Sequence, residues 1–192
     1  MNELFNSLAK FLKRRFGSVD TRLDFLLAND VVASGEKVFE ARVELPIKFS
    51  SGNQLEYGNG QMFRSSKYHN YHDYLLASLN DVIDEVGRID IEDGVAYSLR
   101  TMFIYPIPKS LVSSKKKREA FNPSEVLPIT RGTIDLDNSE KGTNDVLQEV
   151  LGFDDSQIVS KESHKRYWLN DTYVLAVELF KMPSGIEIEF YE

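Results

Sequence analysis

The chain has 192 residues, of which 42% are apolar, with 12 Phe, 9 Tyr and one Trp. This composition excludes a disordered protein and is typical of a globular chain with one hydrophobic core. Cysteine is absent, which excludes disulfides and thiolate metal sites. The formal net charge of −7 argues against a general nucleic-acid coater, because phosphate neutralisation requires Lys and Arg.

Residues 1–36 are expected to form a helical extension to the main domain. Apolar residues recur at helical spacing over 2–16, a second short helix fits 20–29, and 33–37 resembles a linker. Basic residues follow the apolar ones in the first segment, which is the wrong order for a secretory signal. The apolar runs are also too short to span a bilayer. We therefore expect a cytoplasmic protein with no membrane association.

The apolar period changes after the extension and indicates alternating strands and helices. In chain order the pattern predicts a strand over 38–47, a loop over 50–60, a helix over 68–86, a strand over 95–107, a long basic loop over 109–131, a helix over 137–150, and strands over 157–167, 172–181 and 186–191. This order predicts an α/β or α+β fold with a mixed sheet.

Charge is distributed unevenly along the chain. The stretch from Tyr105 to Arg118 contains five cations and no acid, whereas acids cluster between Asp135 and Asp155. A basic loop beside an acidic cluster suits a metal-dependent nuclease. Two unrelated solvated surfaces would produce the same pattern, and this alternative stays open.

The acidic cluster has the spacing of a catalytic site. Asp135 and Asp137 are two residues apart in an extended lead-in and face the same side. Asp137, Lys141 and Asp145 are spaced by four on the predicted helix, along one face. Asp155 follows the helix after a glycine-containing turn, and we expect the chain to fold back there beside the helix start.

Three converging carboxylates would require a cation. Two anions ~4 Å apart repel by roughly 4 kcal/mol at an effective dielectric near 20, and all-oxygen ligation selects Mg²⁺ or Mn²⁺. Lys141 would orient a water or stabilise the transition state. The alternative is structural: Asp137 or Asn138 caps the helix, Lys141 and Asp145 form a surface pair, and Asp155 belongs to a turn.

Taken together, these motifs resemble the RusA family of Holliday junction resolvases, most securely over 103–159 and in all over about 38–192. The motifs are Pro106-Ile107-Pro108-Lys109-Ser110, Asp135-Leu136-Asp137-Asn138, Lys141, Asp145 and Asp154-Asp155-Ser156-Gln157. The resemblance implies a RusA-like mixed sheet with two packed helices over 37–192. It also implies metal ligands at Asp135, Asp137 and Asp155, a catalytic lysine at Lys141, a Mg²⁺ cofactor with Mn²⁺ as substitute, and a homodimer that nicks opposed strands of a four-way junction.

Contacts to DNA phosphates are expected from the basic loop and from the following strand. These residues are Lys109, Lys115, Lys116, Lys117, Arg118, Lys165 and Arg166. Trp168 lies in a hairpin that departs from the family pattern, and three roles stay open for it: a wedge into a junction, an exposed aromatic or a dimer contact. Two other functions also stay open, a nuclease for flaps or forks and a non-catalytic binder of branched DNA.

Overall fold

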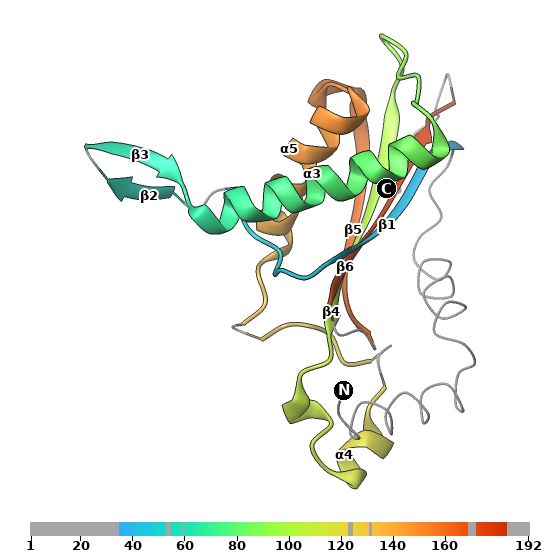
Figure 1. The fold of residues 1–192 in the computed structure, drawn as a ribbon. Helices are drawn as coiled ribbons and strands as arrows, with labels where there is room; N and C mark the ends of the chain where they lie inside the picture. The colour runs from blue at the N-terminus through green and yellow to red at the C-terminus, as the bar shows by residue number, and fades with distance from the viewer. Residues whose placement is uncertain are drawn as a thin grey trace, which may run out of the picture.

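The computed structural model describes residues 35–52, 55–58, 60–122, 125–130, 132–168 and 172–183. They form a four-stranded sheet with the spatial order β1-β6-β4-β5 (Figure 1). The strands are β1 (Glu36–Leu45), β4 (Tyr97–Pro106), β5 (Ile158–Trp168) and β6 (Tyr173–Lys181). β4 runs parallel to β5 and antiparallel to β6, which is antiparallel to β1. The predicted mixed sheet is confirmed.

Two long helices pack on one another and on the sheet: α3 (Ser66–Val86) contacts β1, and α5 (Leu136–Leu151) contacts β5. α3 begins where the Ser65 hydroxyl accepts a hydrogen bond from the Tyr68 amide. α5 ends at Gly152, whose φ of 79° is a left-handed conformation that glycine adopts without a steric penalty. Both helices were predicted from the sequence, over 68–86 and 137–150, and both are confirmed.

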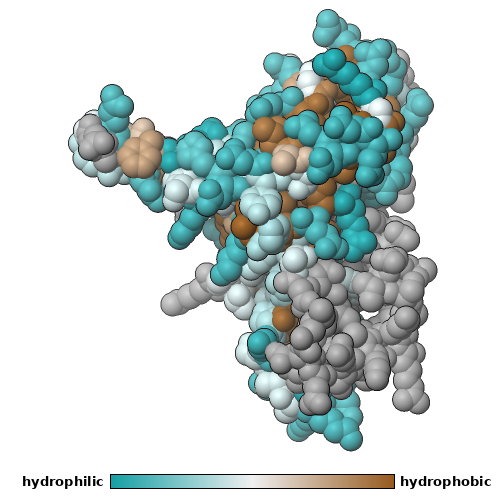
Figure 2. Space-filling model, in the orientation of Figure 1, coloured by the Kyte–Doolittle hydropathy of each residue, from teal (hydrophilic) through white to brown (hydrophobic). Residues whose placement is uncertain are grey.

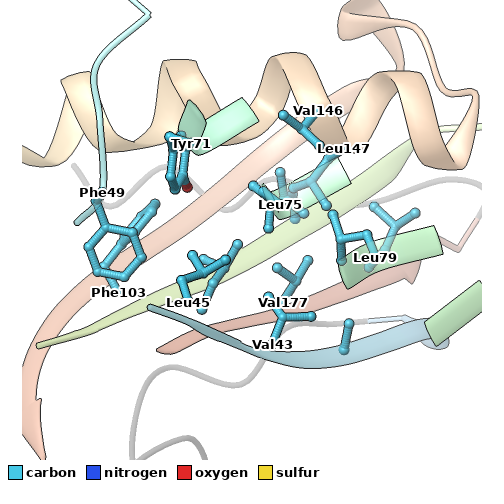
Figure 3. Close-up of a cluster of buried hydrophobic side chains, with 14 of the residues drawn as sticks. Val43, Leu45, Phe49, Tyr71, Leu75, Leu79, Phe103, Val146, Leu147 and Val177 are labelled. Atoms are coloured by element: carbon cyan, nitrogen blue, oxygen red, sulfur yellow. The ribbon is translucent and has the colours of Figure 1, made fainter. Parts of the chain in front are cut away.

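The main core fills the space between this helix pair and the sheet (Figure 3). Alternate strand residues point into it, because successive strand side chains face opposite sides. Phe49 lies at one end of the core, with its ring edge-to-face against Phe103 at 5.1 Å and Tyr105 at 5.2 Å. Burying each such ring contributes roughly 1.5–3 kcal/mol. The segment before α3 is thereby anchored to the sheet.

A hairpin occupies part of the predicted loop at 50–60. Its strands are β2 (Leu55–Gly58) and β3 (Gln61–Arg64), and it projects from the body (Figures 1 and 2). Tyr57 and Met62 on this hairpin are 74% and 60% exposed. The prediction of a loop was therefore wrong here. Each strand has only four residues, and the turn residues around them dominate the local composition.

The predicted long basic loop at 109–131 also contains secondary structure. It includes a 3-10 turn, η1 (Lys109–Leu111), and a short helix, α4 (Lys115–Ala120). The Ser114 hydroxyl accepts from the Lys117 amide at 3.2 Å and caps α4. The basic run is therefore helical.

Trp168 belongs to a second cluster, on the sheet face opposite the main core. It is 2% exposed and packs with Met102, Ile104, Val174 and Ala176. An exposed aromatic, a junction wedge or a dimer contact at this position is therefore not supported. The predicted hairpin is also absent from the described sheet, since β5 and β6 each pair with β4 and not with each other.

Several predictions lie outside the described residues: the extension apart from its last two residues, and the strand at 186–191. Within the described part of the chain, no helix has both the length and the apolar character needed to cross a membrane.

Candidate active site

Asp135 and Asp137 lie at the start of α5. Asp135 is the N-cap residue, and its backbone carbonyl accepts from the Ser139 amide at 3.0 Å, but its carboxylate forms no capping hydrogen bond. Asp137 lies in the first turn and Lys141 one turn later, and all three side chains are exposed. The positive end of the helix dipole favours both anions. The Asp135 carboxylate is thus not used to cap the helix.

Strand β5 holds the chain directly in front of Asp135. The Nζ of Lys165 donates a hydrogen bond of 3.0 Å to the carbonyl oxygen of Ile134. Arg166 points to the opposite face of the sheet, because its register partner is Ile104 in the second cluster. Lys165 and Arg166 therefore do not form the single DNA-binding surface that was predicted. Of these two residues, Lys165 is the one that lies close to the candidate site.

The loop before the hairpin presses against the first half of α5. The hydroxyl of Ser51 donates to Oδ1 of Asn138 at 3.0 Å. A Cβ added at Gly142 would lie 2.6 Å from the carbonyl oxygen of Ser50, so only glycine permits this backbone approach. Neither Ser51 nor Gly142 was identified from the sequence, because the contact joins residues about 90 positions apart.

The Asp145 side chain contacts α3 and the hairpin. Its Oδ2 accepts from the Tyr68 hydroxyl at 2.9 Å and lies 3.1 Å from an Arg64 guanidinium nitrogen. Burial, together with this hydrogen bond to Asp145, raises the pKa of Tyr68 to about 12. Asp145 therefore links α5 to α3 and β3, a role that helical spacing alone did not indicate.

Asp154 and Asp155 have different roles, because the first stabilises a turn and the second has an exposed side chain. Asp154 caps the 3-10 turn η2 (Asp155–Gln157) by accepting from the Ser156 amide at 2.8 Å. Hydrogen bonds from the Ser156 hydroxyl and amide lower the pKa of Asp154. The Oε1 of Gln157 accepts a hydrogen bond from the Asp154 amide, and its Nε2 donates to the carbonyl of Glu92, both at 2.9 Å. The Asp155 side chain is exposed at the start of this turn.

The three predicted metal ligands do not meet within this chain. α5 has 16 residues and separates the Asp135–Asp137 pair from Asp155. At 1.5 Å per residue its length is about 24 Å. Among the described residues, no three His, Cys, Asp or Glu side chains lie close enough to share a metal ion. The expectation that Asp155 folds back beside the helix start was wrong, because the chain continues into β5 from the far end of α5.

The donor chemistry at the helix start nevertheless suits a hard divalent cation. Asp135 and Asp137 offer carboxylate oxygens, which are the ligands that Mg²⁺ prefers, and both are exposed. The chain supplies two such carboxylates at this point.

The basic residues of η1 and α4 have mixed roles. Lys117 donates to the carbonyl of Ser110 at 2.8 Å, and Arg118 donates to that of Val112 at 3.2 Å, so both stabilise the turn before α4. Lys109, Lys115 and Lys116 are exposed. Lys115 lies 3.9 Å from Glu119, and a pair this exposed contributes at most ~1 kcal/mol.

Comparisons with known proteins define the class of this chain. The sequence model described as "Endodeoxyribonuclease RusA" matches residues 46–190, which is most of the chain. The chain therefore belongs to the RusA endodeoxyribonuclease family, as its motifs indicated. It is also similar to the Bacillus subtilis (strain 168) protein named "Uncharacterized protein YqaN", with 40% identity over 62 residues. That stretch covers 32% of this chain and 42% of the relative.

Proposed function

We propose that this protein is a Mg²⁺-dependent endonuclease that resolves four-way DNA junctions in recombination, repair or phage DNA processing. The supporting observation is the start of α5, where Asp135 and Asp137 are exposed and Lys141 follows one turn later, in a chain of the RusA family. The product chemistry is hydrolysis of one phosphodiester bond in each of two strands.

The metal is proposed to be held by Asp135 and Asp137, with Mn²⁺ as a possible substitute for Mg²⁺. When bound there, the metal would supply Lewis-acid chemistry, which polarises a phosphodiester and lowers the pKa of a water. The Lys141 ammonium group, on the same helix, is proposed to stabilise negative charge that develops on the phosphate. Lys165 holds the backbone of Ile134 and so limits movement of the residue that carries the first carboxylate.

A homodimer would account for the position of Asp155. Because α5 separates this residue from the helix start, we propose that each active site combines Asp135 and Asp137 of one protomer with Asp155 of the partner subunit. A two-fold axis then relates two such sites. This arrangement is suited to paired nicks in opposed strands.

DNA contacts are proposed for the exposed cations near η1 and α4 and for Lys165. The exposed residues are Lys109, Lys115 and Lys116. Lys117, Arg118 and Lys165 would contribute less, because each already holds a backbone carbonyl. Arg166 lies on the other face of the sheet and is not included.

Cleavage of a synthetic four-way junction tests the proposed function. We expect paired nicking with Mg²⁺ or Mn²⁺, no nicking with EDTA, loss of nicking in Asp137→Asn, and much reduced or absent nicking in Lys141→Ala. Asp84→Asn, at an exposed position of α3, is the matched charge control and should cleave like the wild type. Equal cleavage by wild type and Asp137→Asn would rule out this mechanism.

Two alternatives make different predictions in the same experiment. A nuclease for other branched DNA would cut flaps or forks faster than junctions at fixed salt. A non-catalytic binder would retain junctions without cutting them in either metal. The exposed acids at the start of α5 favour a catalytic protein over such a binder.

A further inference from the structure

A cavity of about 570 Å³ lies beside the start of α5. One wall is the loop from Ile47 to Ser51, a second is the first turn of α3 with Lys67 and Asn70, and a third is the segment 132–134. The last residue of that segment, Ile134, directly precedes Asp135. The cavity therefore adjoins the proposed metal ligands and is not part of the ligand set itself.

The walls of this cavity are fixed to the same elements that carry the candidate active site. Ser50 and Ser51 are 8% and 3% exposed, and Ser51 is hydrogen-bonded to Asn138 on α5. Ile134 on the opposite wall is held by Lys165. A cavity with walls set before binding loses less entropy when a ligand enters. Two walls of the cavity are thus hydrogen-bonded to α5 and β5, which carry and hold the candidate site.

The lining of the cavity indicates the kind of ligand. Lys48 and Lys67 contribute two ammonium groups, and no acidic side chain is among the described residues that line it. The charge of these lining residues is therefore opposite to the formal net charge of the chain, which is −7. Asn70 and the serines add hydrogen-bonding groups, while Ile47, Phe49 and Ile134 add apolar surface. Two cations over a partly apolar surface suit a phosphate that is attached to a sugar and a base.

We propose that this cavity binds one nucleotide of the cleaved strand, next to the scissile phosphate, and that Lys48 and Lys67 contact its phosphate. The proposal rests on the nuclease function above and adds a substrate subsite to it. It makes Lys48, Lys67 and Asn70 substrate-positioning residues.

Salt-dependent binding provides the first test. Anisotropy of a dye-labelled four-way junction is measured in EDTA at several salt concentrations, so that no cleavage occurs. Each lost phosphate contact reduces the slope of log K against log salt by about 0.7–0.9. In K48A/K67A each of the two subsites of the proposed homodimer would lose the contact to its one phosphate. We therefore expect a slope shallower than that of the wild type by about 1.4–1.8. The matched control is R88A, an exposed cation just past the other end of α3, which should keep the wild-type slope.

Cysteine labelling provides a second test that does not depend on charge. Because the chain has no cysteine, Asn70→Cys and Arg88→Cys each introduce a single thiol. Saturating junction DNA should slow maleimide labelling at position 70 by at least tenfold and leave position 88 unchanged. Thymidine 5′-monophosphate, added as a separate arm at the same nucleotide concentration, should not protect, since a strand and not a free nucleotide is the proposed ligand.

The outcomes separate this inference from the proposed function. If wild type binds and cuts junctions while K48A/K67A keeps the wild-type slope, the subsite is wrong and the nuclease function stands. Equal labelling at position 70 with and without DNA also overturns the subsite. Protection by the free nucleotide alone would replace a DNA subsite with a small-molecule site. If wild type neither binds nor cuts any branched DNA, both proposals fail.

Discussion

Lys165 on β5 donates a hydrogen bond of 3.0 Å to the carbonyl oxygen of Ile134, the residue before Asp135. β5 and α5 are joined through η2 at the far end of the helix, so this bond fixes the near end of α5 to the same strand. The candidate carboxylates are therefore positioned from the sheet as well as from their own helix.

Removing this bond should lower the rate of cleavage more than it weakens DNA binding. A hydrogen bond from a charged donor contributes about 1.5–3 kcal/mol, so we expect Lys165→Met to reduce the single-turnover rate at saturating junction by roughly tenfold or more. Lys165→Arg should restore part of the rate. A variant that loses affinity and salt dependence but keeps its saturated rate would instead identify Lys165 as a phosphate contact only.

Mixing two inactive variants should restore activity if the subunits share a site. In a heterodimer of Asp137→Asn with Asp155→Asn, one site keeps Asp135 and Asp137 of one protomer and Asp155 of the partner subunit. Random exchange of a 1:1 mixture makes about half of the dimers heterodimers, each with one intact site of two. We therefore expect nicking of single strands at about a quarter of the wild-type sites. The reference sample is each variant exchanged with itself, which should stay inactive. If subunit exchange is verified and cleavage activity still does not recover, the shared site is contradicted.

Gly142→Ala should destabilise the protein although alanine is the better helix former. The helical preference favours alanine by roughly 1 kcal/mol. Against this, the new Cβ would lie 2.6 Å from the Ser50 carbonyl oxygen and 3.3 Å from the Gly52 nitrogen, both backbone atoms. Overpacking of this kind costs about 1–3 kcal/mol, so denaturant unfolding should show a net loss. Gly132→Ala is the comparison variant, because its Cβ would meet only Thr130 Oγ1 at 3.9 Å.

Asp145 is expected to matter for stability and not for chemistry. Asp145→Ala leaves the buried Tyr68 hydroxyl without its carboxylate acceptor, which should cost about 1–3 kcal/mol of unfolding free energy. Asp145→Asn keeps an acceptor oxygen, and loses only the attraction to a partly exposed Arg64, so its loss should be smaller. The folded Asp145→Asn protein should cleave near the wild-type rate. Complete loss of cleavage in a stable Asp145→Asn variant would place this residue in the active site.

Two buried phenols should make the fold sensitive to alkali. Burial raises the pKa of Tyr105 to about 12, and the pKa of Tyr68 is also about 12, whereas an ordinary tyrosine ionises near 10. In the unfolded chain these phenols lose their protons first, so their stabilising contribution is complete below pH 10 and is lost between about pH 10 and 12. Unfolding free energy measured across this window should fall less steeply in Tyr105→Phe. An unchanged slope in that variant would show that other groups dominate.

Local patterns were sufficient for the long elements and for the family. The strand periods, the spacing of α3 and α5 and the Asp135-x-Asp137 motif are properties of neighbouring residues, so they can be recognised without a fold. The β2–β3 hairpin was missed because its four-residue strands lie among turn residues. Trp168 was misplaced because its burial depends on strands that are distant in sequence.

The sequence by itself determined the long helices and strands and the family to which the chain belongs, because apolar period and motif spacing are local. Only the tertiary structure decided that Asp155 lies at the opposite end of α5 from Asp137, that Lys165 and Arg166 face opposite sides of the sheet, and that Asp145 binds Tyr68. The physical reason is that each of these relationships depends on helix length, strand pleat or long-range packing, which place side chains in space independently of their order along the chain.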